Sequence, residues 1–317
     1  MVLSAHPEGS DLADIIPMSG RETALRQLAR AYVAGRYKRG EIGAATRRNL
    51  DQTLRTLCAV HGRRPVAQLG PNMIDRWLAS IAHLSPTTRR NHVSRVRRFC
   101  RWLIHCGHLR RDPTLHLDPI RQPRKAVVTL TAGEIERLLA HVAHDDRATL
   151  VVTLMWDACA RCSEVAGIGV EDYDPQRRML TLRGKGGHER EIPLSRRTAA
   201  MLSTYIAAHG LGHGPLLRSR NDLAVGVAGA TLSHYVRGWM IAAGVKVRAR
   251  DGRSAHALRR TGGSELMEAS GNIRVPQAYL GHARIETTAR YYLRPVALDE
   301  LRSAVEARHA APEAKAS

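Results

Sequence analysis

The sequence is poor in aromatic residues, in acids and in long apolar runs. It has a single phenylalanine and 4% aromatic residues in 317, so its cores must rest mainly on Leu, Val, Ile and Ala. The longest apolar run, TLVVTLMW, is too short to span a bilayer, and MVLSAHPEGSDLADIIP has acids where a signal peptide carries positive charge. These absences predict a soluble cytoplasmic protein with no membrane partner.

Cysteine is scarce and odd in number. Five cysteines in a chain of this size argue against a disulfide framework. Cys159 and Cys162 form a CxxC, which raises a zinc or redox site, but the sequence has no second CxxC and the pattern places the pair in a helix. We therefore expect no metal site and no cofactor.

Basic residues exceed acids by a wide margin. The 49 Lys and Arg against 29 Asp and Glu give a net charge of +20, which favours a polyanionic partner, nucleic acid first. A ribosomal-type surface, a membrane-surface protein and an arginine-rich genome bias are the alternatives. Charge alone does not identify an enzyme.

The N-terminal third reads as helices with short polar breaks. The clearest begins at SPTTRRNHVSRVRRFCRWLIHCG, where Ser85 is an expected N-cap and Gly107 ends the run. Helical spacing places four residues on one buried stripe: Val93, Val96, Cys100 and Leu103. The same rotation places three arginines on the far side, either solvated or on phosphate: Arg95, Arg98 and Arg101.

The second half mixes helices with a hairpin. TAGEIERLLAHV reads as a capped amphipathic helix and ATLVVTLMWDACARCSEVAGI as a more buried one. In MLTLRGKGGHEREIPL, apolar and polar residues alternate on both sides of a Gly-rich turn, which predicts a β-hairpin with Lys185 at its tip. The sequence therefore predicts a mainly α fold with a small β-sheet.

Proline-rich RDPTLHLDPIRQPRKAVVTLT looks like an interdomain linker. We expect an N-terminal tail, a helical domain, the linker, a mixed α/β domain and a C-terminal tail, at residues 1–19, 20–112, 113–129, 130–294 and 295–317. The tail has Leu298, Leu301 and Val305 at helical spacing, which suits docking on a neighbouring subunit or packing within the chain.

HALRR places His256 and Arg259 three residues apart, on one face of a helix. A guanidinium fork suits phosphate oxygens, and an imidazole can exchange a proton nearby. Alone this motif is weak, because an exposed His and Arg on a basic helix are more often solvated.

Several motifs in order make the sequence resemble the tyrosine recombinase family, also called the phage integrase family. ARCSEV carries Arg161, RGKGG carries Lys185, HALRR carries His256 and Arg259, LGH carries His282, and TTARYY follows. The N-terminal SPTTRRNHVSRVRRFCRWL, ending in HLRRDP, looks like the family's core-binding domain. Two positions depart from the family pattern: Ala158–Ala160, where Thr-Gly-Leu is frequent, and Arg260, where histidine is frequent.

The resemblance implies a two-domain DNA clamp, with a helical (SAM-like) core-binding domain and a mixed α/β catalytic domain. It implies site-specific recombination through a 3′-phosphotyrosine and a Holliday junction, without metal or ATP, by a homotetramer on two double-stranded DNA sites. We expect such an enzyme, of bacterial or phage origin, to associate with the nucleoid in the cytoplasm. The few residues before the first helix leave no room for an arm-binding domain, which favours a simple integrase, a mobile-element recombinase or a chromosome-dimer resolvase.

The resemblance also assigns roles. Arg161 and Arg259 would clamp the nonbridging phosphate oxygens, the two histidines would hydrogen-bond the phosphate or accept the tyrosine proton, and Lys185 would protonate the 5′-oxygen leaving group. Family spacing, nine residues after His282, selects Tyr291 as the nucleophile and leaves Tyr292 for packing. The alternatives are a type IB topoisomerase and an inactive DNA-binding regulator.

Overall fold

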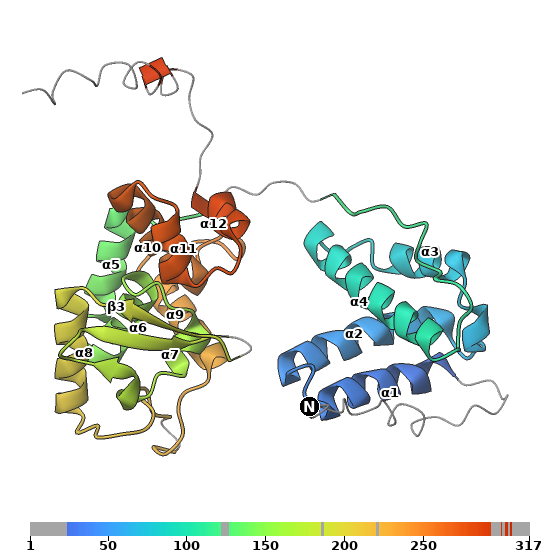
Figure 1. Ribbon diagram of the computed structural model, residues 1–317, viewed down its shortest axis with the longest axis horizontal. Coiled ribbons are helices and arrows are strands. Elements are labelled where there is room, and N and C mark those ends of the chain that lie inside the picture. The colour runs from blue at the N-terminus through green and yellow to red at the C-terminus, as the bar shows by residue number, and fades with distance from the viewer. Residues whose placement is uncertain are drawn as a thin grey trace, which may run out of the picture. The chain divides into compact units, whose positions relative to one another are not determined.

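The computed structural model describes residues 24–121, 127–184, 187–219 and 222–292, together with 299, 302, 303 and 305. The chain divides into two compact units, residues 1–125 and 126–317, called here the N-terminal unit and the C-terminal unit (Figure 1). No helix within the described ranges is long and apolar enough to cross a membrane.

The N-terminal unit is helical. Its elements are α1 Leu25–Lys38, α2 Ala44–His61, the 3₁₀ turn η2 Val66–Gln68, α3 Pro71–Ser80 and α4 Pro86–His105. Helix α4 begins as predicted, because the Ser85 side chain accepts a hydrogen bond from the backbone N–H of Thr88 and a proline occupies the first turn. The predicted stripe is confirmed, since all four of its residues are buried.

Three of the chain's few aromatic rings meet in this core. The ring of Tyr32 lies 5.2 Å from the rings of Phe99 and Trp102, which stack 6.0 Å apart. Trp77 is fully buried and donates its indole N–H to Thr56. The single phenylalanine of the chain lies in this core. The core therefore contains more aromatic rings than we expected from the composition of the whole chain.

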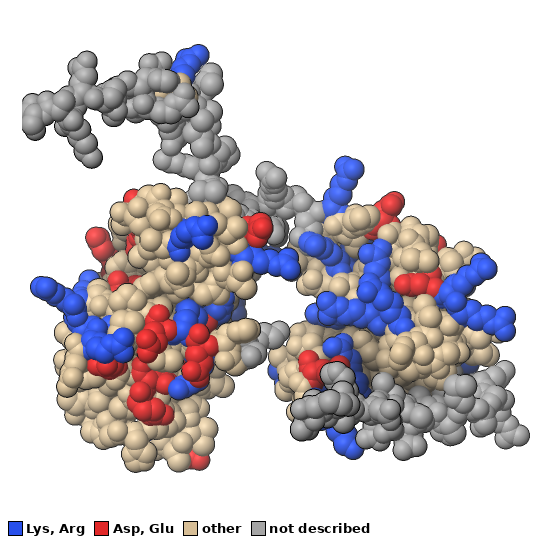
Figure 2. Space-filling model, viewed as in Figure 1, with Lys and Arg blue, Asp and Glu red and all other residues tan. Residues whose placement is uncertain are grey.

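The predicted basic face of α4 is right for two residues and wrong for one. Arg98 and Arg101 are exposed, but Arg95 is partly buried and donates to Thr53 of α2 at 3.1 Å. Burial lowers the pKa of Arg95. Helix α2 packs beside α4 and covers this side chain. A prediction from the angular positions of residues around α4 alone does not include this neighbouring helix. Figure 2 shows many Lys and Arg side chains on one face of this unit.

The C-terminal unit contains a small antiparallel sheet among helices. The sheet has the order β1–β2–β3, with β1 Tyr173–Asp174, β2 Met179–Arg183 and β3 Glu189–Pro193. Strands β2 and β3 form the predicted hairpin, in the register that pairs Leu182 with Arg190. One face of the hairpin enters the core through Leu180, Leu182 and Ile192.

The remaining elements surround this sheet (Figure 1). They are α5 Ala132–Val142, α6 Asp146–Trp156, α7 Cys162–Ala166, the 3₁₀ turn η3 Val170–Asp172, α8 Arg196–Ala208, α9 Gly229–Ala242, α10 Ala255–Ser270, α11 Arg274–Leu280 and α12 Ile285–Tyr292. The expected cap of α5 is confirmed as a reciprocal pair, Thr131 with Glu134. Leu298 and Leu301 of the C-terminal tail lie outside the described residues.

The long helix predicted from ATLVVTLMWDACARCSEVAGI is wrong. The segment forms α6 and α7 with a break at 157–161, so the CxxC does not lie within one helix. Asp157 accepts hydrogen bonds from Ser195 and Thr198, and Cys159 has φ 48°, in the left-handed region. Because neither glycine nor proline occurs in the break, only contacts with distant segments mark it.

Helix α10 approaches this break very closely at Gly262. A Cβ atom on that residue would lie 2.0 Å from the Trp156 carbonyl oxygen and 2.7 Å from the Cys159 sulfur. Only glycine permits such an approach without displacement of the backbone. The contact fixes the position of α10, which carries His256 and Arg259, against the end of α6 and the break that leads to Arg161.

Candidate active site

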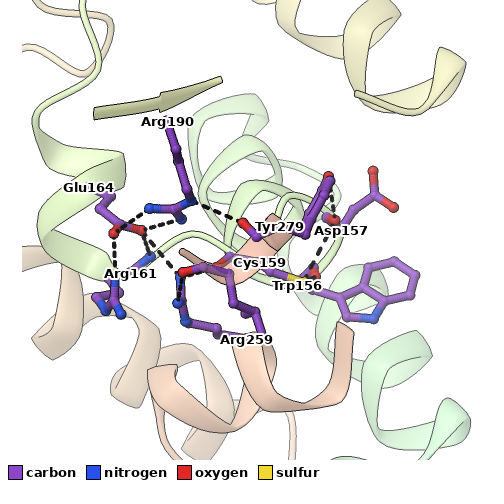
Figure 3. Close-up of polar contacts among 9 residues, drawn as sticks. Trp156, Asp157, Cys159, Arg161, Glu164, Arg190, Arg259 and Tyr279 are labelled. Atoms are coloured by element: carbon purple, nitrogen blue, oxygen red, sulfur yellow. Dashed lines mark hydrogen bonds and ion pairs between the residues drawn. The ribbon is translucent and has the colours of Figure 1, made fainter. Parts of the chain in front are cut away.

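Three arginines from distant segments meet at one carboxylate (Figure 3). Glu164 of α7 accepts from Arg161 at 2.5 Å, from Arg190 of β3 at 2.9 and 3.0 Å, and from Arg259 of α10 at 3.3 Å. It also accepts the backbone N–H of Arg161 at 2.8 Å, which caps the short helix α7. Three guanidinium groups against one carboxylate leave an excess of two positive charges.

The carboxylate is ionised although its side chain is only 1% exposed. Burial alone would raise the pKa of Glu164, but the hydrogen bonds from Arg190 and the charges of Arg190 and Arg259 outweigh it and bring the pKa to about 2. Glu164 therefore serves as a fixed anion that orients the arginines at any pH near neutrality.

Arg259 is buried and held on three sides. It donates to the Cys159 carbonyl at 2.5 Å, to the Leu280 carbonyl at 2.6 Å and to Glu164. Burial and the charge of Arg161 lower its pKa to about 10, so the group stays cationic at neutral pH. Since a guanidinium has five N–H donors, two remain without a partner among the described residues.

Arg190 is a member of this cluster that the sequence did not reveal. Besides Glu164, it donates its Nε–H to the Tyr279 carbonyl at 2.9 Å near the end of α11. It lies on the inward face of β3 with Ile192, and a charged residue at such a position is the signal that could have identified it. A Cβ on Gly281 would lie 2.9 Å from its Cδ, so glycine at that turn leaves room for Arg190.

Partial desolvation and the positive charges of the arginine cluster lower the pKa of both histidines. His256 is exposed in the first turn of α10, and partial desolvation with the charges of Arg259, Arg260 and Arg161 lowers its pKa. His282 follows the left-handed Gly281 at the end of α11. Burial, and then the three arginine charges, bring the pKa of His282 to about 4, so its ring is neutral at pH 7.

Two predicted residues are not described in full. Lys185 lies outside the described residues, in the stretch of sequence between β2 and β3. Tyr291 lies in α12, which contacts α10 and α11, but its side chain is outside the described part of the structure. Of the six predicted catalytic residues, the structure brings Arg161, Arg259, His256 and His282 together.

An open groove of about 850 Å³ adjoins the cluster. Basic and polar side chains from three regions line it, among them Arg161, His188, Arg190, Arg274, Gln277 and His282. Such a groove with excess positive charge and a buried, oriented guanidinium suits a phosphate group whose charge grows in a transition state. Within the described ranges, no group of three metal-ligating side chains occurs.

The sequence is similar to known recombinases. Residues 128–296 match the phage integrase family. The chain is 27% identical over 254 residues to the tyrosine recombinase XerD of Mycobacterium leprae, covering 73% of this chain and 80% of that protein. It is 29% identical over 281 residues to the tyrosine recombinase XerC of Mycobacterium bovis, covering 83% of this chain and 92% of that protein.

The fold is similar to that of solved integrases. The Tn1549 transposon integrase in complex with a circular intermediate DNA aligns with a TM-score of 0.72 at 17% identity, over 90% of this chain and 99% of that one. A lambda integrase dimer bound to a COC′ core site aligns with a TM-score of 0.70 at 16% identity, over 86% and 98%. At these identities the likeness shows the fold.

Proposed function

The chain belongs to the phage integrase family and is a site-specific tyrosine recombinase, and from this premise we propose that the Glu164-centred arginine cluster binds the scissile phosphate of DNA. The observation that carries the proposal is the convergence of Arg161, Arg190 and Arg259 on one buried carboxylate. A single anion cannot neutralise three cations, so the cluster is electrostatically incomplete until a further anion binds.

In this proposal Arg161 and Arg259 donate to the nonbridging oxygens. Arg161 keeps donors free on a side chain that is 34% exposed, and Arg259 keeps two N–H groups without a described partner. Their orientation is fixed before substrate arrives, by Glu164 and by backbone carbonyls. Preorganised donors of this kind contribute roughly 3 to 4 kcal/mol each to transition-state stabilisation.

Tyr291 is the proposed nucleophile. Its phenolic oxygen attacks phosphorus and gives its proton to His256, the bond from phosphorus to the 5′-oxygen breaks, and a proton from Lys185 goes to that oxygen. The product is a 3′-phosphotyrosine and a free 5′-hydroxyl. Attack by the 5′-hydroxyl of a partner strand reverses these steps and rejoins DNA, so neither ATP nor hydrolysis enters the balance.

The N-terminal unit is proposed as the core-binding domain, with Arg98 and Arg101 on the DNA backbone. Both side chains are exposed on α4, in a unit with many Lys and Arg side chains at its surface (Figure 2). Exchange between two duplexes requires four cleavages, which supports a homotetramer on two sites through a Holliday junction. The substrate also implies work in the cytoplasm, where bacterial DNA lies.

Covalent trapping tests this function. Random duplexes are first selected for binding to the full chain, then nicked at successive positions and incubated with dialysed protein in EDTA. We expect a protein–DNA adduct that maps to one phosphate, with DNA linked through its 3′ end to a tyrosine. A chemical step that strictly requires a divalent metal, or no adduct at any nick, would contradict the proposal.

Strand exchange separates recombination from topoisomerase activity. Two duplexes of different length, each with the trapped site, should yield recombinant lengths. Relaxation of supercoiled DNA without recombinant products would favour the type IB topoisomerase, and binding without adduct would favour an inactive regulator.

A further inference from the structure

His282 contacts a buried hydroxyl on the helix that carries the proposed nucleophile. Its Nδ1 lies 2.9 Å from the Oγ1 of Thr288 in α12. Thr288 is fully buried, at 0% exposure, and His282 is only partly exposed. Thr288 also precedes Tyr291 by three residues, so the hydroxyl and the nucleophile lie about one turn apart on α12.

The direction of this hydrogen bond follows from the proton of the hydroxyl. Among the described residues, the His282 nitrogen is the single partner of the Thr288 oxygen. A buried O–H that donates to nothing is costly, whereas an oxygen that accepts nothing is tolerated more easily. The hydroxyl therefore donates, and Nδ1 accepts with its lone pair.

This direction determines what the other ring nitrogen can do. A neutral imidazole carries one N–H, so an accepting Nδ1 places the proton on Nε2. A ring in this tautomer can donate to a phosphate oxygen but has no second lone pair to take a proton from tyrosine. The opposite direction would leave Nε2 as a base.

Resting on the proposed function, we propose that Thr288 is a positioning residue that holds His282 in the Nε2–H tautomer for donation to the scissile phosphate. Thr288 belongs to α12, the helix that carries the nucleophile. The orientation of His282 is therefore coupled to the docking of this helix. The ring gains its orienting partner only when the helix that presents Tyr291 is in place.

The tautomer can be measured directly on the free full-length protein. Histidine labelled with ¹⁵N distinguishes a protonated from an unprotonated ring nitrogen, and His282→Ala assigns the signals. We expect a protonated Nε2 and an unprotonated Nδ1 in the wild type and in Thr288→Ser. Thr288→Val keeps the branched shape without the hydroxyl, and we expect it to show a mixture of both tautomers.

Cleavage kinetics provide a second readout, with the trapped DNA as substrate. Thr288→Val should slow adduct formation by about 10- to 100-fold, the range seen when a partner that orients a metal-bound imidazole is removed. Thr288→Ser should recover most of the rate. If Thr288 acts through His282, the double variant Thr288→Val/His282→Ala should be no slower than His282→Ala alone.

Thr153→Val is the matched control. Thr153 is 2% exposed in α6, and its hydroxyl has no hydrogen-bond partner among the described residues, so the same exchange there should leave the tautomer and the cleavage rate unchanged. A wild-type ring protonated on Nδ1, a Thr288→Ser as slow as Thr288→Val, or additive losses in the double variant would each overturn the proposal. A wild type that forms no adduct would refute the proposed function instead, while the tautomer still decides the role of Thr288.

Discussion

The two units use arginine in opposite ways. In the N-terminal unit, Arg98 and Arg101 extend into solvent from α4. In the C-terminal unit, the side chains of Arg190 and Arg259 are 14% and 6% exposed and are bound to Glu164 and to backbone carbonyls. The two arginines of α4 present charge at the surface, whereas Arg190 and Arg259 hold charge in fixed positions around an anion.

The difference shows that charge has two separate functions in one chain. Exposed arginines attract a polyanion over a distance, but salt screens them and their side chains keep their freedom. Burying an arginine has a desolvation penalty. The fixed geometry of such a side chain is useful when a reaction needs donors that are already oriented. Substitutions that compare a buried ion pair with an exposed one therefore test this account.

Glu164→Gln should have the largest effect on folding. The change leaves three arginines without their anion, and loss of one partner from a buried pair costs about 3–5 kcal/mol of unfolding free energy. Urea denaturation at pH 7 measures it. Glu189→Gln is the control, since Glu189 pairs with Arg183 at 2.9 Å but its side chain is 56% exposed, and we expect a loss of about 1 kcal/mol or less.

The same variant should alter the dependence of stability on acid. The folded pKa of Glu164, about 2, lies below the ordinary 4.5, so its contribution is full above the ordinary value and is lost as pH falls toward 2. Wild-type stability should fall over this window, and the Glu164→Gln curve should be flatter there. Parallel curves would show that folding does not lower the pKa of this carboxyl.

Arg259→Ala should lower the rate of adduct formation at saturating DNA by about 10²- to 10³-fold, because it removes an oriented donor. Arg259→Lys should recover little, since an ammonium cannot bond the Cys159 and Leu280 carbonyls and the phosphate together. Arg98→Ala, measured in parallel, should lose far less at saturation. Equal losses for the buried and the exposed arginine would end the distinction between the units.

Gly262→Ala should displace the helix that carries Arg259. The new methyl would collide with the Trp156 carbonyl, and overpacking of this kind costs about 1–3 kcal/mol. We expect a lower temperature of thermal unfolding and a lower rate of adduct formation. Gly238→Ala in α9 is the matched helical control, since a Cβ there meets nothing within 4 Å, and it should be neutral or stabilising.

The smallest effect is expected at the exposed arginines. Arg98→Ala and Arg101→Ala should each weaken DNA binding and reduce the slope of log affinity against log salt by about 1. Titration at several salt concentrations measures the slope. An unchanged slope would mean that the basic face of α4 is solvated and not on phosphate.

Local patterns in the sequence predicted what depends on neighbouring residues. The caps at Ser85 and Thr131, the buried stripe of α4 and the β2–β3 hairpin each have a local signal, and each is present. The ordered motifs also located Arg161, His256, Arg259 and His282, which converge.

What the sequence did not reveal depends on contacts between distant segments. The break before α7 is held by Ser195, Thr198 and Arg259, which lie 38 to 100 residues from the residues they bind. Arg190 reaches Glu164 across 26 residues and the Tyr279 carbonyl across 89. The periodicity of apolar residues contains no information on such pairs. These contacts could therefore be identified only from the three-dimensional structure.

The most direct test of the central claim is which tyrosine carries the DNA. Tyr291→Phe and Tyr292→Phe each remove one phenolic oxygen from the same helix and are incubated with the nicked substrate in EDTA. The account predicts no adduct for Tyr291→Phe, with DNA binding near that of the wild type, and an adduct for Tyr292→Phe whose DNA maps to Tyr291 by peptide sequencing. An adduct on Tyr291→Phe, or its loss in Tyr292→Phe alone, would contradict it.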